Sequence, residues 1–110
     1  MVIIMEKLGR IALLNDIYGN LLTDKQKMML DMFYNEDLSL GEIAEINQTS
    51  RQAVFDNIKR SEKALENYEA KLGLLARNIN ENLLLNKLEE AYEKRDWNMI
   101  KNVVDLLSAE

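Results

Sequence analysis

Apolar residues recur every three or four positions along most of the chain, which is the spacing of one face of an α-helix. The first such stripe runs from Leu8 to Tyr18, and it is followed by Gly19, a residue type that commonly ends helices. The chain has no proline, only four glycines and many Leu, Lys and Glu residues, a composition that favours helices. We therefore expect an all-α protein.

Two short helices are predicted next, and both begin with a capping box. In this motif a hydroxyl side chain and a Gln or Glu side chain three residues later bond free backbone N–H groups. Thr23 pairs with Gln26 in the first helix, and Ser39 pairs with Glu42 in the second. The apolar residues expected to face inward are Met29, Leu30 and Phe33 in the first helix and Leu40, Ile43 and Ala44 in the second.

The longest stripe begins after Ser50, which is placed to cap a helix with Ala53, Val54 and Ile58 on its buried side. Apolar residues continue from there at spacings of three and four. We expect one helix from Ser50 to about Leu72, with Gly73 at its end.

The far part of this stripe has two interpretations. It forms either a dimer interface or the floor on which the C-terminal helices pack. We expect a homodimer, because two copies would hold two DNA-reading helices at a fixed spacing. The candidate dimerisation residues are Leu65, Tyr68, Leu72 and Leu75.

Two further amphipathic helices are expected near the C-terminus, with Asp96 as a cap between them and Trp97 as a packing anchor. Their apolar residues are Ile79, Leu83, Leu84, Leu88 and Tyr92 in the first helix and Trp97, Ile100, Val104 and Leu107 in the second.

A helix-turn-helix needs a capped short helix, a tight turn and a capped second helix. Residues 39–60, "SLGEIAEINQTSRQAVFDNIKR", meet the first and third of these requirements. Ala44 is small enough for the two helices to cross closely. Arg and Gln near the start of the second helix suit guanine and adenine edges, whereas Lys and Arg further along suit phosphates. The predicted nucleic-acid-binding residues are Ser50, Arg51, Gln52, Phe55, Asp56, Lys59, Arg60 and Lys63.

Each of these roles has a plainer alternative. Arg51 either contacts a base or forms a surface salt bridge with Glu42 or Glu45. Phe55 either contacts a thymine methyl group or covers the hydrophobic core. The whole outer face of the helix either reads nucleic acid or contacts a protein.

The charge of the chain sharpens this question. Its 14 basic and 19 acidic residues give a net charge of −5, whereas a non-specific nucleic-acid binder is usually basic. Between Arg51 and Lys63, however, four basic residues face two acidic ones. The positive excess therefore coincides with the predicted reading helix.

Cysteine and histidine are both absent, which excludes disulfides, Cys/His zinc sites and histidine-based catalysis. The acidic residues lie at helical surface spacing and do not form a motif, so we expect no metal site and no cofactor. With no nucleophile, base or cofactor loop in the sequence, we do not expect an enzyme.

A chain of 110 residues suits one domain. We expect a single all-α domain over residues 1–110, with a helix-turn-helix core at about 23–63 and a helical extension at about 64–110. The longest wholly apolar run, "MVIIM", is far shorter than the roughly 20 residues of a membrane span and lacks the features of a secretory signal. We therefore expect a cytoplasmic protein with no integral membrane segment.

The segments "IYGNLLTDKQ", "EDLSLGEIAE" and "SRQAVFDNIKRSE" cover much of residues 17–62. They resemble the promoter-reading C-terminal domain of bacterial sigma factors and, more closely, the YlxM family of small helix-turn-helix proteins. The resemblance implies a sigma-factor-type helix-turn-helix head whose long recognition helix continues into C-terminal helices. It assigns to the recognition helix Ser50, Arg51, Gln52, Ala53, Val54, Asp56, Asn57, Lys59 and Arg60, with Phe55 where an aromatic is usual.

The turn "INQT" departs from the family pattern, because Asn47 and Thr49 stand where apolar residues are expected. Gln48 stands where a left-handed backbone is expected, a conformation that Asn tolerates better than Gln. We therefore expect the first helix of the motif to end one residue early, with Ile46 supplying the missing core contact and the turn altered.

Two functions remain open at this point. The protein is either a DNA-binding regulator or an accessory factor that binds the RNA or the GTPase of the signal recognition particle. The second function is implied by the resemblance, since members of the family are encoded beside that GTPase. Residues 76–110 carry no motif that distinguishes the two.

Overall fold

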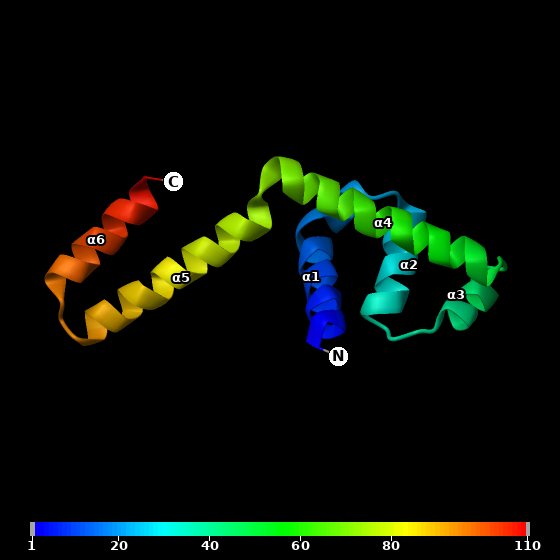
Figure 1. Cartoon of the computed structure of the whole chain (residues 1–110), viewed down its shortest axis with the longest axis horizontal. Coiled ribbons are helices and arrows are strands. Elements are labelled where there is room, and N and C mark those ends of the chain that lie inside the picture. The colour runs from blue at the N-terminus through cyan, green and yellow to red at the C-terminus, as the bar shows by residue number, and fades with distance from the viewer. Residues whose placement is uncertain (1, 110) are drawn as a thin grey trace. The chain divides into compact units, whose positions relative to one another are not determined.

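A computed structural model describes the backbone of residues 2–109 and the side chains of residues 6–109. The side chains of the "MVIIM" run thus lie outside the described residues. Within the described chain there are six α-helices, one short 3-10 turn and no strand, which confirms the all-α prediction (Figure 1). The elements are α1 (Val2–Tyr18), η1 (Gly19–Leu21), α2 (Asp24–Tyr34), α3 (Leu40–Ile46), α4 (Arg51–Leu72), α5 (Leu74–Glu93) and α6 (Trp97–Ser108).

The chain divides into two compact units, Met1–Gly73 and Leu74–Glu110. None of the helices in the described part of the chain combines the length and the apolar character that a membrane crossing needs.

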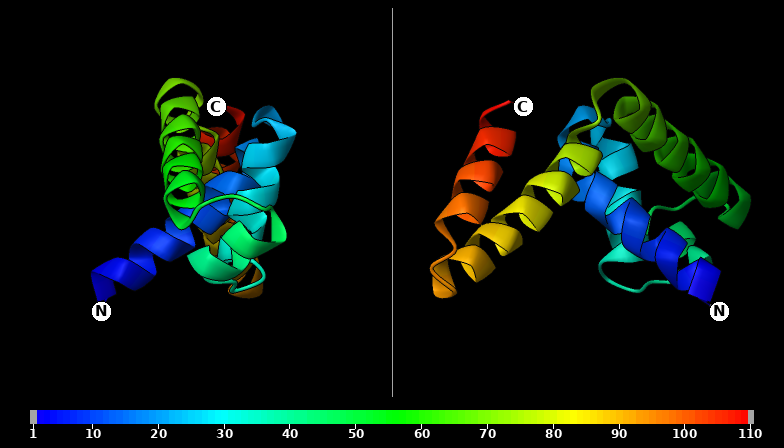
Figure 2. Two further views of the ribbon diagram at one scale, coloured as in Figure 1. Left: turned by 90° about the vertical axis from the view of Figure 1, so that its right-hand side faces the viewer. Right: turned by 60° about the vertical axis from the view of Figure 1, so that its left-hand side comes forward.

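In the first unit, α1, α2 and α3 all pack against α4, as two further views also show (Figure 2). The inward side of α4 carries Val54, Ile58 and Leu65, all of which are buried. Burial of one such side chain stabilises the fold by about 1.5–3 kcal/mol. The facing core residues are Leu14 and Tyr18 from α1, Met29 and Leu30 from α2, and Ile43 and Ala44 from α3.

Side-chain hydrogen bonds confirm the predicted starts of α2 and α3. Thr23 Oγ1 accepts a hydrogen bond from the N–H of Gln26 at 3.2 Å, and Gln26 Oε1 accepts one from the N–H of Thr23 at 3.1 Å. Ser39 and Glu42 repeat this capping box at 3.1 and 3.2 Å. These bonds satisfy N–H groups that would otherwise have no partner in the first turn of each helix.

The end of α4 is also where the sequence predicts it. Gly73 has a φ of 62°, a left-handed conformation that glycine adopts without steric cost, and its N–H donates to the carbonyl of Glu69 at 2.8 Å. A helix of 22 residues therefore ends at Leu72 because the next residue reverses the backbone.

Polar contacts join α1 to the second half of α4. The Arg10 guanidinium donates to both carboxylate oxygens of Glu66, at 2.7 and 2.9 Å. The Tyr18 hydroxyl donates to Glu69 at 2.7 Å, and its ring stacks on that of Tyr68 with the centroids 5.9 Å apart. These contacts fix α1 along α4.

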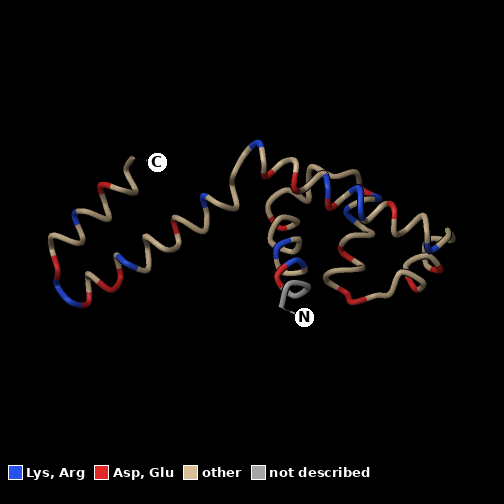
Figure 3. Tube along the Cα trace, in the orientation of Figure 1, with Lys and Arg blue, Asp and Glu red and all other residues tan. Residues whose placement is uncertain are grey.

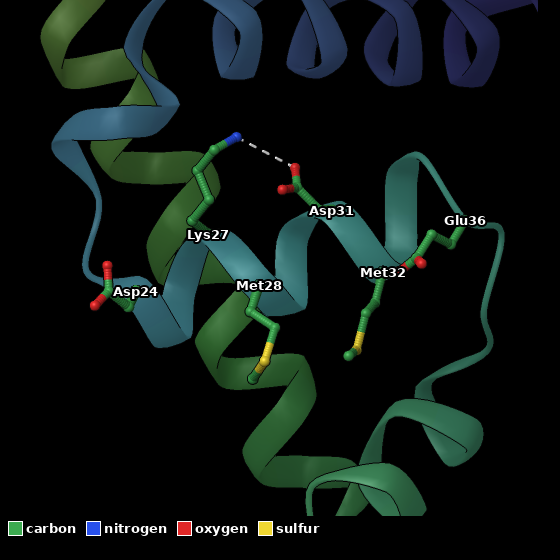
Figure 4. Close-up of a pocket in the computed structure, with 6 residues that line it drawn as sticks. All are labelled: Asp24, Lys27, Met28, Asp31, Met32 and Glu36. Carbon is green, nitrogen blue, oxygen red and sulfur yellow. Dashed lines mark hydrogen bonds and ion pairs between the residues drawn. The ribbon is translucent and has the colours of Figure 1, made fainter.

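A second polar cluster joins α1 to α2. Asn15 is buried, and its amide donates to Asp31 at 2.7 Å while its carbonyl oxygen accepts from Lys27 at 3.2 Å. A Cβ atom at Gly19 would overlap the side-chain ends of Asn15 and Lys27, so a larger residue here would displace these hydrogen-bonded groups. Figure 4 shows the Lys27–Asp31 ion pair, with Met28 and Met32 pointing away from it along a shallow groove on α2.

The second unit is a hairpin of α5 and α6. Asp96 caps α6 as predicted, since its carboxylate accepts from the N–H of Met99 at 3.1 Å. The buried residues Leu84, Ala91 and Val103 lie between the two helices. Trp97, by contrast, is 65% exposed, so the prediction that it is a packing anchor is wrong. It opens the first turn of α6, on a flank that the hairpin itself does not cover.

We expect the Arg10–Glu66 pair to make stability depend on pH. The hydrogen bonds from Arg10 are the main cause that lowers the pKa of Glu66 below its ordinary value. A lowered carboxylate pKa stabilises the fold above the unfolded pKa of about 4.3, and this stabilisation is lost as the pH falls through the folded pKa. Because both side chains are more than 40% exposed, the pair should contribute no more than about 0.5 kcal/mol.

Glu66→Gln should therefore lower the melting temperature by about 2–4 °C at pH 7. At an acidic pH below the folded pKa of Glu66 the difference should vanish, because the carboxyl group is then protonated in both states. The matched control is Glu89→Gln, since Glu89 is exposed and the described part of the chain offers it no ion pair. An equal loss of stability at both pH values would contradict the electrostatic origin of the effect.

Candidate nucleic-acid interface

The helix-turn-helix is formed by α3, the turn at residues 47–50 and the first turns of α4. Ile43 and Ala44 on α3 meet Val54 and Ile58 on α4, and all four side chains are buried. Ser50 Oγ accepts from the N–H of Ala53 at 3.0 Å and so caps α4 as predicted. The core and caps of the motif therefore match the sequence.

The turn itself differs from our expectation. Gln48 has a φ of 53°, so Gln48 rather than Asn47 takes the left-handed conformation. The N–H of Thr49 donates to the carbonyl of Ala44 at 3.0 Å, and that of Gln48 donates to Glu45 at 3.3 Å. These two bonds make a Schellman motif, the common ending of an α-helix. The turn is therefore regular, although its left-handed residue is a glutamine.

Ile46 was expected to supply a core contact, and this is wrong because its side chain is 58% exposed. Asn47 and Thr49 occupy the half-buried positions instead. The Asn47 side-chain amide donates a hydrogen bond to the carbonyl of Ile43, one turn earlier, at 2.8 Å. The same amide nitrogen lies 3.8 Å from the sulfur of Met32. A polar residue is accommodated here because it hydrogen-bonds the end of its own helix.

The outward face of α4 carries polar and basic side chains. Gln52 donates to Asp56 at 2.9 Å, so these two side chains form a local pair. Arg60 and Lys63 are exposed, and neither has an ion-pair partner among the described residues. Figure 3 shows several basic positions along α4 with acidic ones between them.

Lys59 and Phe55 lie together on one flank of this helix. The Lys59 ammonium is 5.5 Å from the centre of the Phe55 ring and 3.3 Å from Glu62 Oε2. Phe55 lines an apolar groove of about 280 Å³, so it faces this groove rather than the outward face. The other lining residues include Leu8, Phe33, Tyr34, Leu40 and Ile58.

Glu62 explains why Lys59 leans to this side. Its side chain is almost fully buried, and it accepts a short hydrogen bond from the Tyr34 hydroxyl. Burial, reinforced by this bond, raises the pKa of Tyr34 well above its ordinary value. A buried carboxylate requires such partners, because leaving it unpaired would be strongly destabilising. Tyr34 and Lys59 thus both donate hydrogen bonds to the buried Glu62 carboxylate.

Arg51 is exposed at the start of α4, and its guanidinium lies over the backbone of Gly41 in α3. A Cβ atom on Gly41 would come within 3.3 Å of Arg51 Nε. Within the described chain Arg51 forms no ion pair, so the suggested salt bridges with Glu42 and Glu45 are absent from this structure.

Sequence reasoning missed Tyr34, Glu62 and Gly41. Glu62 follows Ile58 by four residues and precedes Leu65 by three, so helical spacing alone places it on the buried side of α4. That position could have identified a buried acid in need of a partner. Nothing in the sequence pairs it with Tyr34, which lies 28 residues away.

The four candidate dimerisation residues do not form one open surface. Leu65 is fully buried, Tyr68 stacks on Tyr18, and Leu75 is also buried. Of the four, Leu72 alone is exposed. The homodimer stays a prediction, and these positions give it little accessible apolar area.

Across the described residues, no three His, Cys, Asp or Glu side chains come together as a metal site.

Comparisons with known proteins agree with this architecture. Residues 5–105 match the model of the UPF0122 family, described as "Putative helix-turn-helix protein, YlxM / p13 like". A UPF0122 protein of Clostridium botulinum is 45% identical over 109 residues, which cover 94% of this chain and 100% of the relative. A Listeria welshimeri relative is 48% identical over 92 residues, or 84% of each chain. One from Clostridium kluyveri is 56% identical over 80 residues, covering 71% of this chain and 72% of the relative.

The left-handed glutamine offers a direct test of the turn. Gln48→Gly should stabilise the protein by about 1 kcal/mol, because a non-glycine residue in this conformation costs roughly 1–2 kcal/mol. Urea unfolding followed by circular dichroism measures the change.

The converse control is Gly73→Ala. Gly73 has a similar φ, and a Cβ atom there meets nothing within 4 Å, so the substitution should destabilise by a similar amount through the backbone alone. A loss of stability in Gln48→Gly would show that the turn does not adopt this conformation.

Proposed function

Because the chain belongs to the UPF0122 family of YlxM/p13-like helix-turn-helix proteins, we propose that it is a regulatory protein that binds duplex DNA through α4. The family is described by its helix-turn-helix, and we propose no enzymatic activity for the chain. We place the protein in the cytoplasm, where such a regulator would meet DNA.

One observation carries the proposal. The stretch of α4 from Arg51 to Lys63 carries four basic side chains, while both of its carboxylates have side-chain partners. Asp56 accepts from Gln52, and Glu62 accepts from Tyr34 and Lys59. Its four basic residues outnumber its two acidic ones, and Glu62 is turned to the core and paired with Lys59, so the stretch keeps a positive excess toward a phosphate backbone. The basic residues are Arg51, Lys59, Arg60 and Lys63.

The proposed roles follow from position. Arg51 and Gln52, near the N-terminus of α4, are the candidates for base contacts, and Ser50 at the cap adjoins N–H groups that suit a phosphate. Arg60 and Lys63 are candidates for phosphate contacts that orient the helix. Phe55 and Lys59 lie to one side and would act at the edge of the interface.

A second function is favoured by the groove beside Phe55. Its apolar lining suits a protein side chain better than duplex DNA, whose surface is charged. We therefore keep as the alternative an accessory factor that binds the GTPase or the RNA of the signal recognition particle, the pathway that the family resemblance implies.

The DNA hypothesis predicts a steep salt dependence. Lys63→Ala should weaken binding to all duplexes alike and reduce the slope of log affinity against log salt by about 1. Arg51→Ala should instead relax the sequence preference, by about 1–3 kcal/mol at the base it contacts. Selection from a random duplex library followed by fluorescence anisotropy measures both effects.

Lys87→Ala is the matched control, because Lys87 is an exposed lysine on the second unit, outside the helix-turn-helix. A parallel pull-down with the particle's RNA and GTPase tests the alternative. Absence of duplex binding at low salt, with retention of either particle component, would replace the first function by the second.

A further inference from the structure

The α5–α6 hairpin has an apolar face that its own two helices leave open. Leu85 and Tyr92 are seven residues apart and therefore lie on one side of α5, and the same spacing places Trp97 and Val104 on one side of α6. Tyr92 is 58% exposed and Trp97 is 65% exposed. These four residues are called the hairpin face below.

The hairpin face is on one flank only. The opposite flank holds a groove whose lining includes the charged residues Lys87, Glu90 and Lys94 together with Met99. At 100° per residue, Leu85 and Tyr92 lie on the side of α5 away from Lys87 and Glu90. Trp97 and Val104 likewise lie on the side of α6 away from Met99. Near the interhelical loop the two exposed aromatic side chains, Tyr92 and Trp97, thus lie on one flank, with the Arg95 guanidinium 5.3 Å from the centre of the Tyr92 ring. Exposed leucines, Leu83 and Leu106, also lie on the opposite flank, which has no exposed aromatic residue among the described side chains of the hairpin.

The hairpin is too small to be stable by its own core. The unit Leu74–Glu110 has fewer than 40 residues, a size below about 40 at which disulfides, metals or oligomerisation are usually needed. The chain has no cysteine, and the described residues contain no metal-ligand cluster. Of these three sources of stability, oligomerisation is therefore the one that suits this unit.

The sign of the charge narrows the choice of partner. Residues 74–110 carry seven acidic and five basic side chains, which disfavours nucleic acid and anionic lipid on this unit. A second copy of the same hairpin is suited, because its net charge is small and two antiparallel helix pairs close into a four-helix bundle.

We propose that the hairpin face is the homodimer interface, in which two copies pair about a two-fold axis and bury Leu85, Tyr92, Trp97 and Val104. The half-buried residues Leu88 and Ile100 lie between these four and would complete the shared core. The inference extends the proposed function, but it does not depend on DNA binding.

The available area is of the right size. A Tyr or Trp side chain can bury 150–250 Å². When the area of each of the four side chains is scaled by its exposed fraction, they offer roughly 400 Å² of accessible apolar surface per copy. A standard interface buries about 800 Å² per partner, of which somewhat more than half is non-polar. The hairpin face therefore supplies about the apolar part of one such interface.

Sedimentation of the full chain tests the proposal. The wild-type protein should sediment at twice its monomer mass of 12.8 kDa. Leu85→Glu places two like charges in the interface and should weaken dimerisation at least ~30-fold. Leu83→Glu is the matched control, because Leu83 is the same residue type on the same helix, is similarly exposed and faces the other flank. It should change the dissociation constant by less than about threefold.

Trp97 provides a second readout that needs no variant. It is the one tryptophan of the chain, so its emission should move to longer wavelength when the wild-type protein is diluted to monomers. A wild-type protein that stays monomeric overturns the proposal. A dimer that persists in Leu85→Glu also overturns it. If Leu83→Glu then dissociates the dimer, the interface lies on the other flank of the hairpin, and if Leu72→Glu does so, it lies at the end of α4.

Discussion

The N-terminal unit depends on one continuous row of buried side chains along α4. Val54, Ile58 and Leu65 lie on this row, and three other helices contact it at different heights. Because α4 is a rigid helix, fixing its inward side also fixes where Gln52, Arg60 and Lys63 point. The same burial that holds the unit together therefore presents the basic face to a partner.

Short sequence motifs predicted most of the helix boundaries of the N-terminal unit. Capping boxes, the N-cap at Ser50 and the glycine after Leu72 each act over a few residues. The sequence alone therefore located where α2, α3 and α4 begin and where α4 ends. The turn before α4 was harder, because two local preferences conflicted there. Propensity disfavours Gln48 in a left-handed conformation, yet the paired Schellman bonds and the fit of α3 against α4 outweigh that preference.

The polar interior of the site could not be predicted in the same way. The sequence shows that Glu62 lies on the buried side of α4, but its partner Tyr34 comes from α2 through tertiary packing. This pairing has a consequence for the candidate interface. It engages Glu62 with the core and draws Lys59 toward Phe55, so the basic face is set partly by a buried contact behind it.

Hydrophobic periodicity also has a built-in limit that the C-terminal unit makes visible. It predicts correctly that α5 and α6 are helices, because both contain residues that avoid water. It does not say whether such residues meet another part of the same chain or another molecule. The apolar spacing of Trp97 suggested a core residue, but exposure depends on how many helices surround a position. A two-helix hairpin buries only positions between its helices, such as Ala91 and Val103, and Trp97 is not one of them. The residues that periodicity places inside, and that the chain leaves outside, are therefore where a partner is to be sought.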